Sequence, residues 1–258
     1  MKIFFMGATK FGFKCMLKAI NLGFEIVGCA YTPKVFNISY APKGVNNINY
    51  FDFAEAARQF NIPCISYDKD NIEDFNSRVK SLEPDLIIVA GWYYMLPKLL
   101  REIAPKGVIG LHASLLPRYR GGAPLVWAMI NGEKYTGLSM FYISQGVDTG
   151  DIIGQESFEI GESDTIADLL VKTEAAAEVL LEKYLPLMAT DKAPRIKQKE
   201  SDVTIYPQRS PKDGEIDWSW EPQRIRNFIR AQTHPYPGAF TVISGKKIII
   251  WDADIIEE

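Results

Sequence analysis

The residues best suited to move a proton are a histidine and an aspartate, His112 and Asp148, 36 positions apart. His112, one of only two histidines, ends an apolar segment, 107–112, that reads as a buried strand. Asp148 lies in "SQGVDTGDII", a glycine-flanked loop between two predicted strands. A carboxylate beside an imidazole favours the imidazolium and fixes the ring, so the pair could transfer a proton near neutral pH. The spacing alone also allows a purely structural interpretation, in which His112 caps a loop and Asp148 forms a turn.

Two other features resemble functional sites, but neither predicts a reaction: the second histidine and a glycine-containing turn near the N-terminus. The second histidine, His234, lies in the turn-rich "THPYPGAF" and is interpreted as a loop residue bonded to the backbone. The stretch "GATKFG", residues 7–12, is not a phosphate loop, because a Walker motif needs Lys and then Ser or Thr where Phe13 and Lys14 stand. It also lacks the second glycine of a dinucleotide fingerprint. We therefore expect a strand-to-helix turn at the carboxyl end of a strand, where open α/β sheets bind ligands.

The elements that must position these residues alternate along the chain. Residues 2–7, 11–23 and 24–32 read as strand, helix and strand, which implies a parallel sheet with a right-handed crossover. Residues 33–50 are expected to be irregular. The alternation then resumes, with helices expected at 51–61, 72–83, 95–104, 123–132 and 164–189, and strands at 63–67, 85–91, 107–112, 136–144 and 151–160.

This pattern predicts an α/β fold of two parts. Residues 1–189 form a Rossmann-like, mostly parallel sheet with helices on both faces. After a change of composition at 190–200, which reads as a linker, residues 200–258 form a small C-terminal β-rich domain. In that domain we expect a helix at 221–232 and a hairpin at 239–255 that turns at Ser244 and Gly245.

Composition narrows the function classes. The 258 residues are 47 % hydrophobic, which suffices for a full core. The net charge is -3 without a basic block, so non-specific nucleic-acid binding is not expected. Three separated cysteines suggest neither a disulfide framework nor a metal site. Without a signal peptide or an 18-residue apolar run, we expect a cytoplasmic protein with no membrane partner.

The segment around His112 resembles a known enzyme family. "GLHASLLPRYRGGAP", residues 110–124, followed by "GVDTGDII", is similar to the 10-formyltetrahydrofolate-dependent formyltransferases, which carry an N-x-H-x-SLLP-x-x-RG signature and a D-x-G loop. Residues 209–218 and 229–240 resemble segments of methionyl-tRNA and sugar-nucleotide formyltransferases. The resemblance implies a formyl-folate-binding catalytic domain at 1–189, and transfer of a formyl group from N10 of the folate to a primary amine.

The resemblance also assigns roles to residues. It makes His112 the catalytic acid and base, with Asp148 keeping it charged or oriented. "YYMLP", residues 93–97, resembles the segment whose backbone holds the pterin of the co-substrate, N10-formyltetrahydrofolate. The folate contacts it implies are Tyr94, Met95, Leu96, Ser144, Gln145, Gly146 and Val147.

Gly110 departs from the family pattern, which has Asn two residues before the histidine. Alternation along a strand puts positions 110 and 112 on one face, where that Asn can donate to the formyl oxygen. Loss of one oxyanion donor typically costs about 10²–10³-fold in rate. Water, a backbone N–H or Gln145 could substitute, or the enzyme is slow, or it no longer formylates. We expect Gly110→Asn to raise the rate or leave it unchanged.

The expected acceptor is the amine of a dTDP- or UDP-linked 4-amino-4-deoxy sugar, as in lipopolysaccharide O-antigen synthesis. The tRNA-specific enzymes are longer, and this chain lacks a basic surplus. The candidates to meet the sugar nucleotide's phosphates are Lys10, Arg118 and Arg120. Two alternatives stay open: a methionyl-tRNA formyltransferase, and a folate- or sugar-nucleotide-binding protein that has lost catalysis. The hairpin edge at 239–255 could pair across a homodimer.

Overall fold

A computed structural model of the chain describes residues 1–38 and 41–256. Its contacts separate the chain into two compact units. The first unit comprises Met1–His112, Ser139–Gln155 and Ala177–Gln198, and the second comprises Ala113–Leu138, Glu156–Ala176 and Lys199–Glu258. The division into domains at 1–189 and 200–258 stays a prediction.

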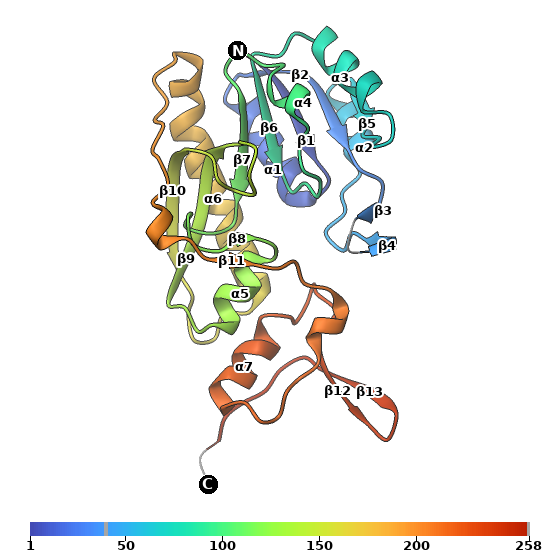
Figure 1. Cartoon of the computed structure of the whole chain (residues 1–258), viewed down its shortest axis with the longest axis vertical. Coiled ribbons are helices and arrows are strands. Elements are labelled where there is room, and N and C mark those ends of the chain that lie inside the picture. The colour runs from blue at the N-terminus through green and yellow to red at the C-terminus, as the bar shows by residue number, and fades with distance from the viewer. Residues whose placement is uncertain (39–40, 257–258) are drawn as a thin grey trace. The chain divides into compact units, whose positions relative to one another are not determined.

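A seven-stranded sheet carries the first unit, in the order β10-β9-β7-β6-β1-β2-β5 (Figure 1). Strand β1 runs parallel to both β2 and β6, β2 is parallel to β5, and β6 is parallel to β7, whereas β9 lies antiparallel to β7. This mostly parallel sheet confirms the predicted fold class. The strands are β1 (Lys2–Gly7), β2 (Glu25–Tyr31), β5 (Cys64–Ser66), β6 (Leu86–Ala90), β7 (Val108–His112), β9 (Tyr135–Tyr142) and β10 (Ile152–Glu159).

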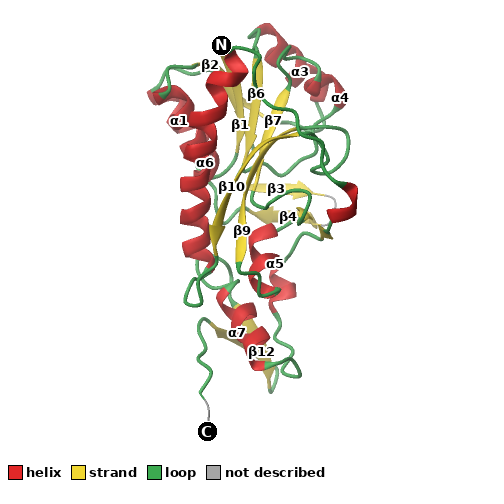
Figure 2. Ribbon diagram, turned by 90° about the vertical axis from the view of Figure 1, so that its left-hand side faces the viewer, coloured by secondary structure: helices red, strands yellow, loops and turns green. Residues whose placement is uncertain are grey.

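Helices cover both faces of the sheet, as predicted. Figure 2 shows α1 and α6 on one face and α3 and α4 on the other. Alternating side chains of β1 explain this, because Phe4 and Met6 pack in a cluster with Phe75 of α3 and Leu100 of α4, whereas the Phe5 ring stacks on Phe53 of α2. The helices are α1 (Lys10–Asn21), α2 (Phe53–Gln59), α3 (Ile72–Ser81), α4 (Lys98–Arg101), α5 (Pro124–Ile130) and α6 (Ile166–Ala189).

The turn at 7–12 is the predicted strand-to-helix connection. The Thr9 hydroxyl accepts a hydrogen bond from the Gly12 N–H at 3.2 Å and so caps helix α1. A Cβ atom on Gly12 would lie 2.4 Å from the carbonyl oxygen of Ala90. Gly12 therefore lets α1 approach strand β6 closely.

Two local expectations were wrong. Residues 33–50 are not irregular throughout, because β3 (Val35–Ile38) and β4 (Ala41–Asn46) form an antiparallel pair. The buried Phe36 of β3 packs on Tyr93 at 4.8 Å between ring centroids, a long-range contact that local composition does not reveal. The helix expected at 95–104 shrinks to α4, since Pro97 stands in extended conformation, with φ -63° and ψ 156°, at its N-cap.

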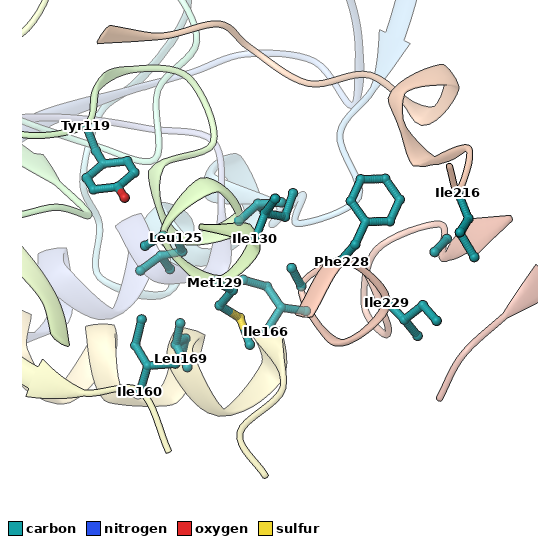
Figure 3. Close-up of a cluster of buried hydrophobic side chains, with 14 residues drawn as sticks. Tyr119, Leu125, Met129, Ile130, Ile160, Ile166, Leu169, Ile216, Phe228 and Ile229 are labelled. Carbon is teal, nitrogen blue, oxygen red and sulfur yellow. The ribbon is translucent and has the colours of Figure 1, made fainter. Parts of the chain in front are cut away.

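The second unit has its own core of buried apolar side chains (Figure 3). Met129 of α5, Ile166 of α6 and Phe228 of α7 (Pro222–Arg230) belong to it. The predicted hairpin is confirmed as β12 (Ala239–Ile243) and β13 (Lys246–Ile250), joined by Ser244 and Gly245 at φ 51° and 73°. The remaining elements are β8 (Arg120–Gly121), its parallel partner β11 (Ile205–Tyr206), and the short helices η1 (Glu200–Asp202) and η2 (Pro211–Gly214).

Over residues 1–38 and 41–256, none of the helices combines the length and the apolar character needed to cross a bilayer.

Candidate active site

The first unit brings His112 and Asp148 together, as the sequence suggested. The Nδ1 atom of His112 lies 3.5 Å from Oδ2 of Asp148, and the two side chains are only 11 % and 19 % exposed. His112 ends β7 at the carboxyl edge of the sheet, and Asp148 follows β9. The separation is at the upper limit for a hydrogen bond between the ring nitrogen and the carboxylate.

The loop that carries Asp148 is tightly constrained. Asp148 has a left-handed backbone, with φ 52°. The hydroxyls of Ser144 and Thr149 hydrogen-bond at 2.7 Å and join the two sides of the loop. A Cβ atom on Gly150 would lie 1.6 Å from the carbonyl oxygen of Tyr142, so only glycine allows this approach. Of the expected folate contacts here, Gln145, Gly146 and Val147 are exposed.

Gly110 faces an apolar side chain instead of an open space. It lies directly opposite Phe141 in the β7–β9 register. A Cβ atom on Gly110 would lie 2.9 Å from Cε1 of Phe141, which is only 4 % exposed. The Phe141 ring also meets the His112 ring edge-on, with 6.5 Å between centroids. Phe141 thus occupies the room that an Asn side chain would need, which changes the expectation for Gly110→Asn.

The segment expected to hold folate lies among aromatic rings. Tyr94 packs on Phe36 and Tyr67, with 5.7 and 5.1 Å between ring centroids, and its hydroxyl donates to the Asn37 carbonyl at 3.1 Å. Burial raises the pKa of Tyr94, so its hydroxyl keeps its proton and remains a donor. The Met95 side chain is 59 % exposed, whereas Leu96 is buried in the core.

The same segment has polar groups that a flat heterocycle could use. Between β6 and α4 the chain forms neither helix nor strand, so its backbone N–H and C=O groups lie outside the sheet ladder. Within the described part of the chain, the buried Nε1 of Trp92 has no hydrogen-bond acceptor. Buried donors are normally paired, so an orphan indole N–H beside this backbone fits a ligand with acceptor atoms, such as a pterin.

The three basic candidates are in different surroundings. Lys10 is the exposed first residue of α1, in the first unit. In the second unit, the Arg118 guanidinium forms an ion pair with Glu133, and Nη2 of Arg120 lies 3.2 Å from Oε1 of Glu200. Each of the two arginines thus already pairs with a carboxylate. Phosphate binding by Lys10, Arg118 and Arg120 stays a prediction.

Sequence reasoning missed a contact to the Asp148 loop. Residues 190–200 read as a linker, yet the Gln198 side chain donates to the backbone carbonyls of Asp148 and Gly150 at 2.8 and 2.7 Å. The sequence around Gln198 contains no motif that would predict this contact. His234, in the second unit, stacks on Trp251 with 3.9 Å between ring centroids.

Comparisons with known proteins identify the family of this chain. The Formyl transferase family matches residues 38–185, and the Formyl transferase C-terminal domain matches residues 209–258. The chain is 36 % identical over 260 residues to the methionyl-tRNA formyltransferase of Alkaliphilus oremlandii, covering 100 % of this chain and 81 % of that protein.

Solved structures share the fold. A 4-N formyltransferase from Francisella tularensis superposes with a TM-score of 0.74 at 23 % identity, covering 99 % of this chain and 98 % of that one. An N-formyltransferase from Helicobacter canadensis, in complex with folinic acid and dTDP-3-aminofucose, gives a TM-score of 0.72 at 19 % identity, covering 96 % and 86 %. By its family match and its sequence identity, this chain belongs to the formyltransferase family, whose formyl donor is N10-formyltetrahydrofolate.

Proposed function

We propose that this formyltransferase acts on the primary amine of a nucleotide-linked amino sugar, a dTDP- or UDP-linked 4-amino-4-deoxy sugar. The observation that carries the proposal is charge. Residues 199–258 contain eight Lys and Arg against ten Asp and Glu. A protein that binds tRNA gains most of its affinity by neutralising many phosphates with basic side chains. A sugar nucleotide presents only two phosphates, which a few local cations can meet.

The reaction uses the His112–Asp148 pair for proton transfer. The acceptor nitrogen attacks the formyl carbon, the bond from that carbon to N10 breaks, and the formyl group stays on the acceptor. The acceptor nitrogen loses one proton and N10 gains one, so the balance closes if His112 carries that proton between them. Asp148, with Oδ2 3.5 Å from Nδ1 of the ring, orients the imidazole.

The formyl oxygen becomes negative as the tetrahedral intermediate forms. Gly110 offers no side-chain donor, and the neighbouring Phe141 ring is apolar. Stabilisation then falls to a backbone N–H, a water molecule, Gln145 or the imidazolium itself. Because one missing donor typically costs about 10²–10³-fold, a slow chemical step is consistent with this site.

A second candidate acceptor is methionyl-tRNA, whose α-amino group is the same kind of nucleophile. The specific observation in its favour is the 36 % identity to a methionyl-tRNA formyltransferase over the whole of this chain. The solved structures named above share less than 25 % identity with this chain, so they support its fold but not the choice of acceptor.

A panel of acceptors tests the proposal. The purified chain is incubated with N10-formyltetrahydrofolate and either dTDP- and UDP-linked 4-amino-4-deoxy sugars or charged initiator methionyl-tRNA. Tetrahydrofolate release is measured, together with the product's mass gain of one CO. Turnover of a sugar but not of the tRNA supports the proposal.

Two outcomes would overturn it. Turnover of tRNA but of no sugar, with a rate that falls steeply as salt rises, would assign the second candidate. Tight calorimetric binding of formyl-folate without turnover of any acceptor would instead identify a binding protein that has lost catalysis.

A further inference from the structure

The segment after helix α6 contacts the backbone of the Asp148 loop. Nε2 of Gln198 donates to the carbonyl oxygens of Asp148 at 2.8 Å and of Gly150 at 2.7 Å. A side-chain amide has two hydrogens, so both bonds can form at once. The two carbonyls flank Thr149, and the single amide therefore fixes the orientation of two nearby peptide planes.

The loop needs such support because Asp148 is held in a strained backbone conformation. Its φ of 52° lies in the left-handed region, which residues other than glycine adopt uncommonly, with Asn and Asp among the more tolerant. That conformation persists only where the surroundings impose it. One of the two carbonyls that Gln198 binds belongs to Asp148 itself. This hydrogen bond restrains the backbone of Asp148, and through it the direction in which the Asp148 carboxylate points.

Neighbours of Gln198 anchor the segment at both ends of the loop. Ile196 and Ile152 exchange two backbone hydrogen bonds, at 2.8 and 2.9 Å, where β10 begins. The Arg195 guanidinium lies 3.6 Å from the ring centroid of Tyr142, the last residue of β9. Residues 195–198 therefore contact both strands that carry the loop.

We propose that Gln198 is a positioning residue for the His112–Asp148 pair. It touches no reacting atom. It fixes the backbone of Asp148 so that the carboxylate stays at the 3.5 Å separation from Nδ1 of His112. The inference rests on the proposed role of that pair in proton transfer and extends it to a residue 50 positions beyond Asp148.

Substitutions that remove only the donor test this role. Gln198→Met keeps most of the length without hydrogen-bond donors, and Gln198→Glu keeps the shape but offers only acceptors to the two carbonyls. We expect kcat to fall by about 10- to 100-fold, as for other small misplacements of catalytic groups. The matched control is Lys197→Met, because the adjacent Lys197 side chain is 90 % exposed and lies 4.0 Å from the Asp151 carboxylate. Thermal melting of each variant reports whether it is folded.

A double-mutant cycle separates positioning from general stability. If Gln198 acts through Asp148, then Gln198→Met lowers kcat in the wild type but causes no further loss in an Asp148→Asn background. Losses that multiply in the double variant would overturn the proposal. The acceptor in these assays is whichever one turns over in the panel above.

An NMR measurement tests the inference without turnover. The chain has two histidines, so His234→Asn assigns the Hε1 resonance of His112. We expect Gln198→Met and Asp148→Asn to shift this resonance in the same direction and Lys197→Met to leave it in place. An unmoved resonance in Gln198→Met would contradict the proposal. Suppose that the resonance moves in Gln198→Met while the separate variant His112→Ala still turns over. That outcome would support the positioning role of Gln198 and refute the catalytic role of the His112–Asp148 pair.

Discussion

At the scale of single residues, the proposed chemistry depends on one imidazole. Replacing His112 by Ala removes the group that carries the proton, and general acid–base catalysis typically contributes about 10²–10⁴-fold. We expect His112→Ala to abolish measurable turnover while formyl-folate still binds, as calorimetry would show. His234→Ala is the matched control, because that ring stacks on Trp251 in the second unit. Activity above about a tenth of wild type would refute the role assigned to His112.

Gly110 and Phe141 form a second pair at this scale. Because a Cβ atom at position 110 would lie 2.9 Å from the buried Phe141 ring, Gly110→Asn overpacks the sheet. Such insertions typically cost about 1–3 kcal/mol, so we expect a lower melting temperature and a lower rate. The double variant Gly110→Asn with Phe141→Ala has room for the amide and should recover activity relative to Gly110→Asn. A single variant as stable and as fast as wild type would show that the ring moves aside freely.

At the scale of elements, Asn47 ties the end of β4 to the first strand-to-helix turn. Its side chain is 2 % exposed, donates to the Ala8 carbonyl at 2.8 Å and accepts from the Tyr93 hydroxyl at 2.9 Å. Unpairing buried partners costs about 1–3 kcal/mol, which in a chain of this size lowers the melting temperature by about 3–10 °C. We expect that loss in Asn47→Ala.

The matched control for this element is Asn71→Ala. Asn71 stands at the N-cap of α3 but makes no side-chain capping bond, and it is exposed. Thermal melting followed by circular dichroism compares the two variants. Equal melting temperatures would mean that the Asn47 bonds do not stabilise the junction between β4 and the turn at Ala8.

At the scale of the whole molecule, hydrogen-bonded carboxylates make stability depend on acid. Backbone N–H donation from Thr165 lowers the pKa of Asp168, and donation from Ser210 lowers the pKa of Asp213. A carboxylate with a lower pKa in the folded state stabilises the protein above its unfolded pKa, about 3.9. That contribution is lost as the pH falls below about 4 towards the folded pKa.

Melting curves from pH 6 to pH 2.5 check this dependence. We expect Asp168→Asn with Asp213→Asn to be less stable than wild type at pH 6 and to lose less stability on acidification. The effect is small because both side chains are largely exposed to solvent, which screens the interactions. Asp254→Asn, near the C-terminus, is the control. Parallel curves for the double variant and wild type would contradict the assignment.

The predictable part of the fold followed local patterns. Apolar runs such as 85–91 became the buried strand β6, and the Ser244-Gly245 pair formed its hairpin. Residues 33–50 were mispredicted because β3 and β4 depend on Phe36 packing against Tyr93, almost sixty positions away in sequence. The helix expected at 95–104 is shorter because Pro97, in extended conformation at the N-cap, delays its start to Lys98.

The sequence by itself determined the alternation of strands and helices, the family, and His112 and Asp148 as partners, because these depend on local periodicity and on a recognisable motif. Only the tertiary structure decided that Phe141 fills the space beside Gly110 and that Gln198 binds the carbonyls around Asp148. It also brought the thiols of Cys29 and Cys64 to 2.9 Å. These contacts join residues that are 31 to 50 positions apart in sequence. They depend on the register of paired strands and on the path by which residues 195–198 come back to the Asp148 loop. Neither the register nor that path leaves a pattern among neighbouring residues of the sequence.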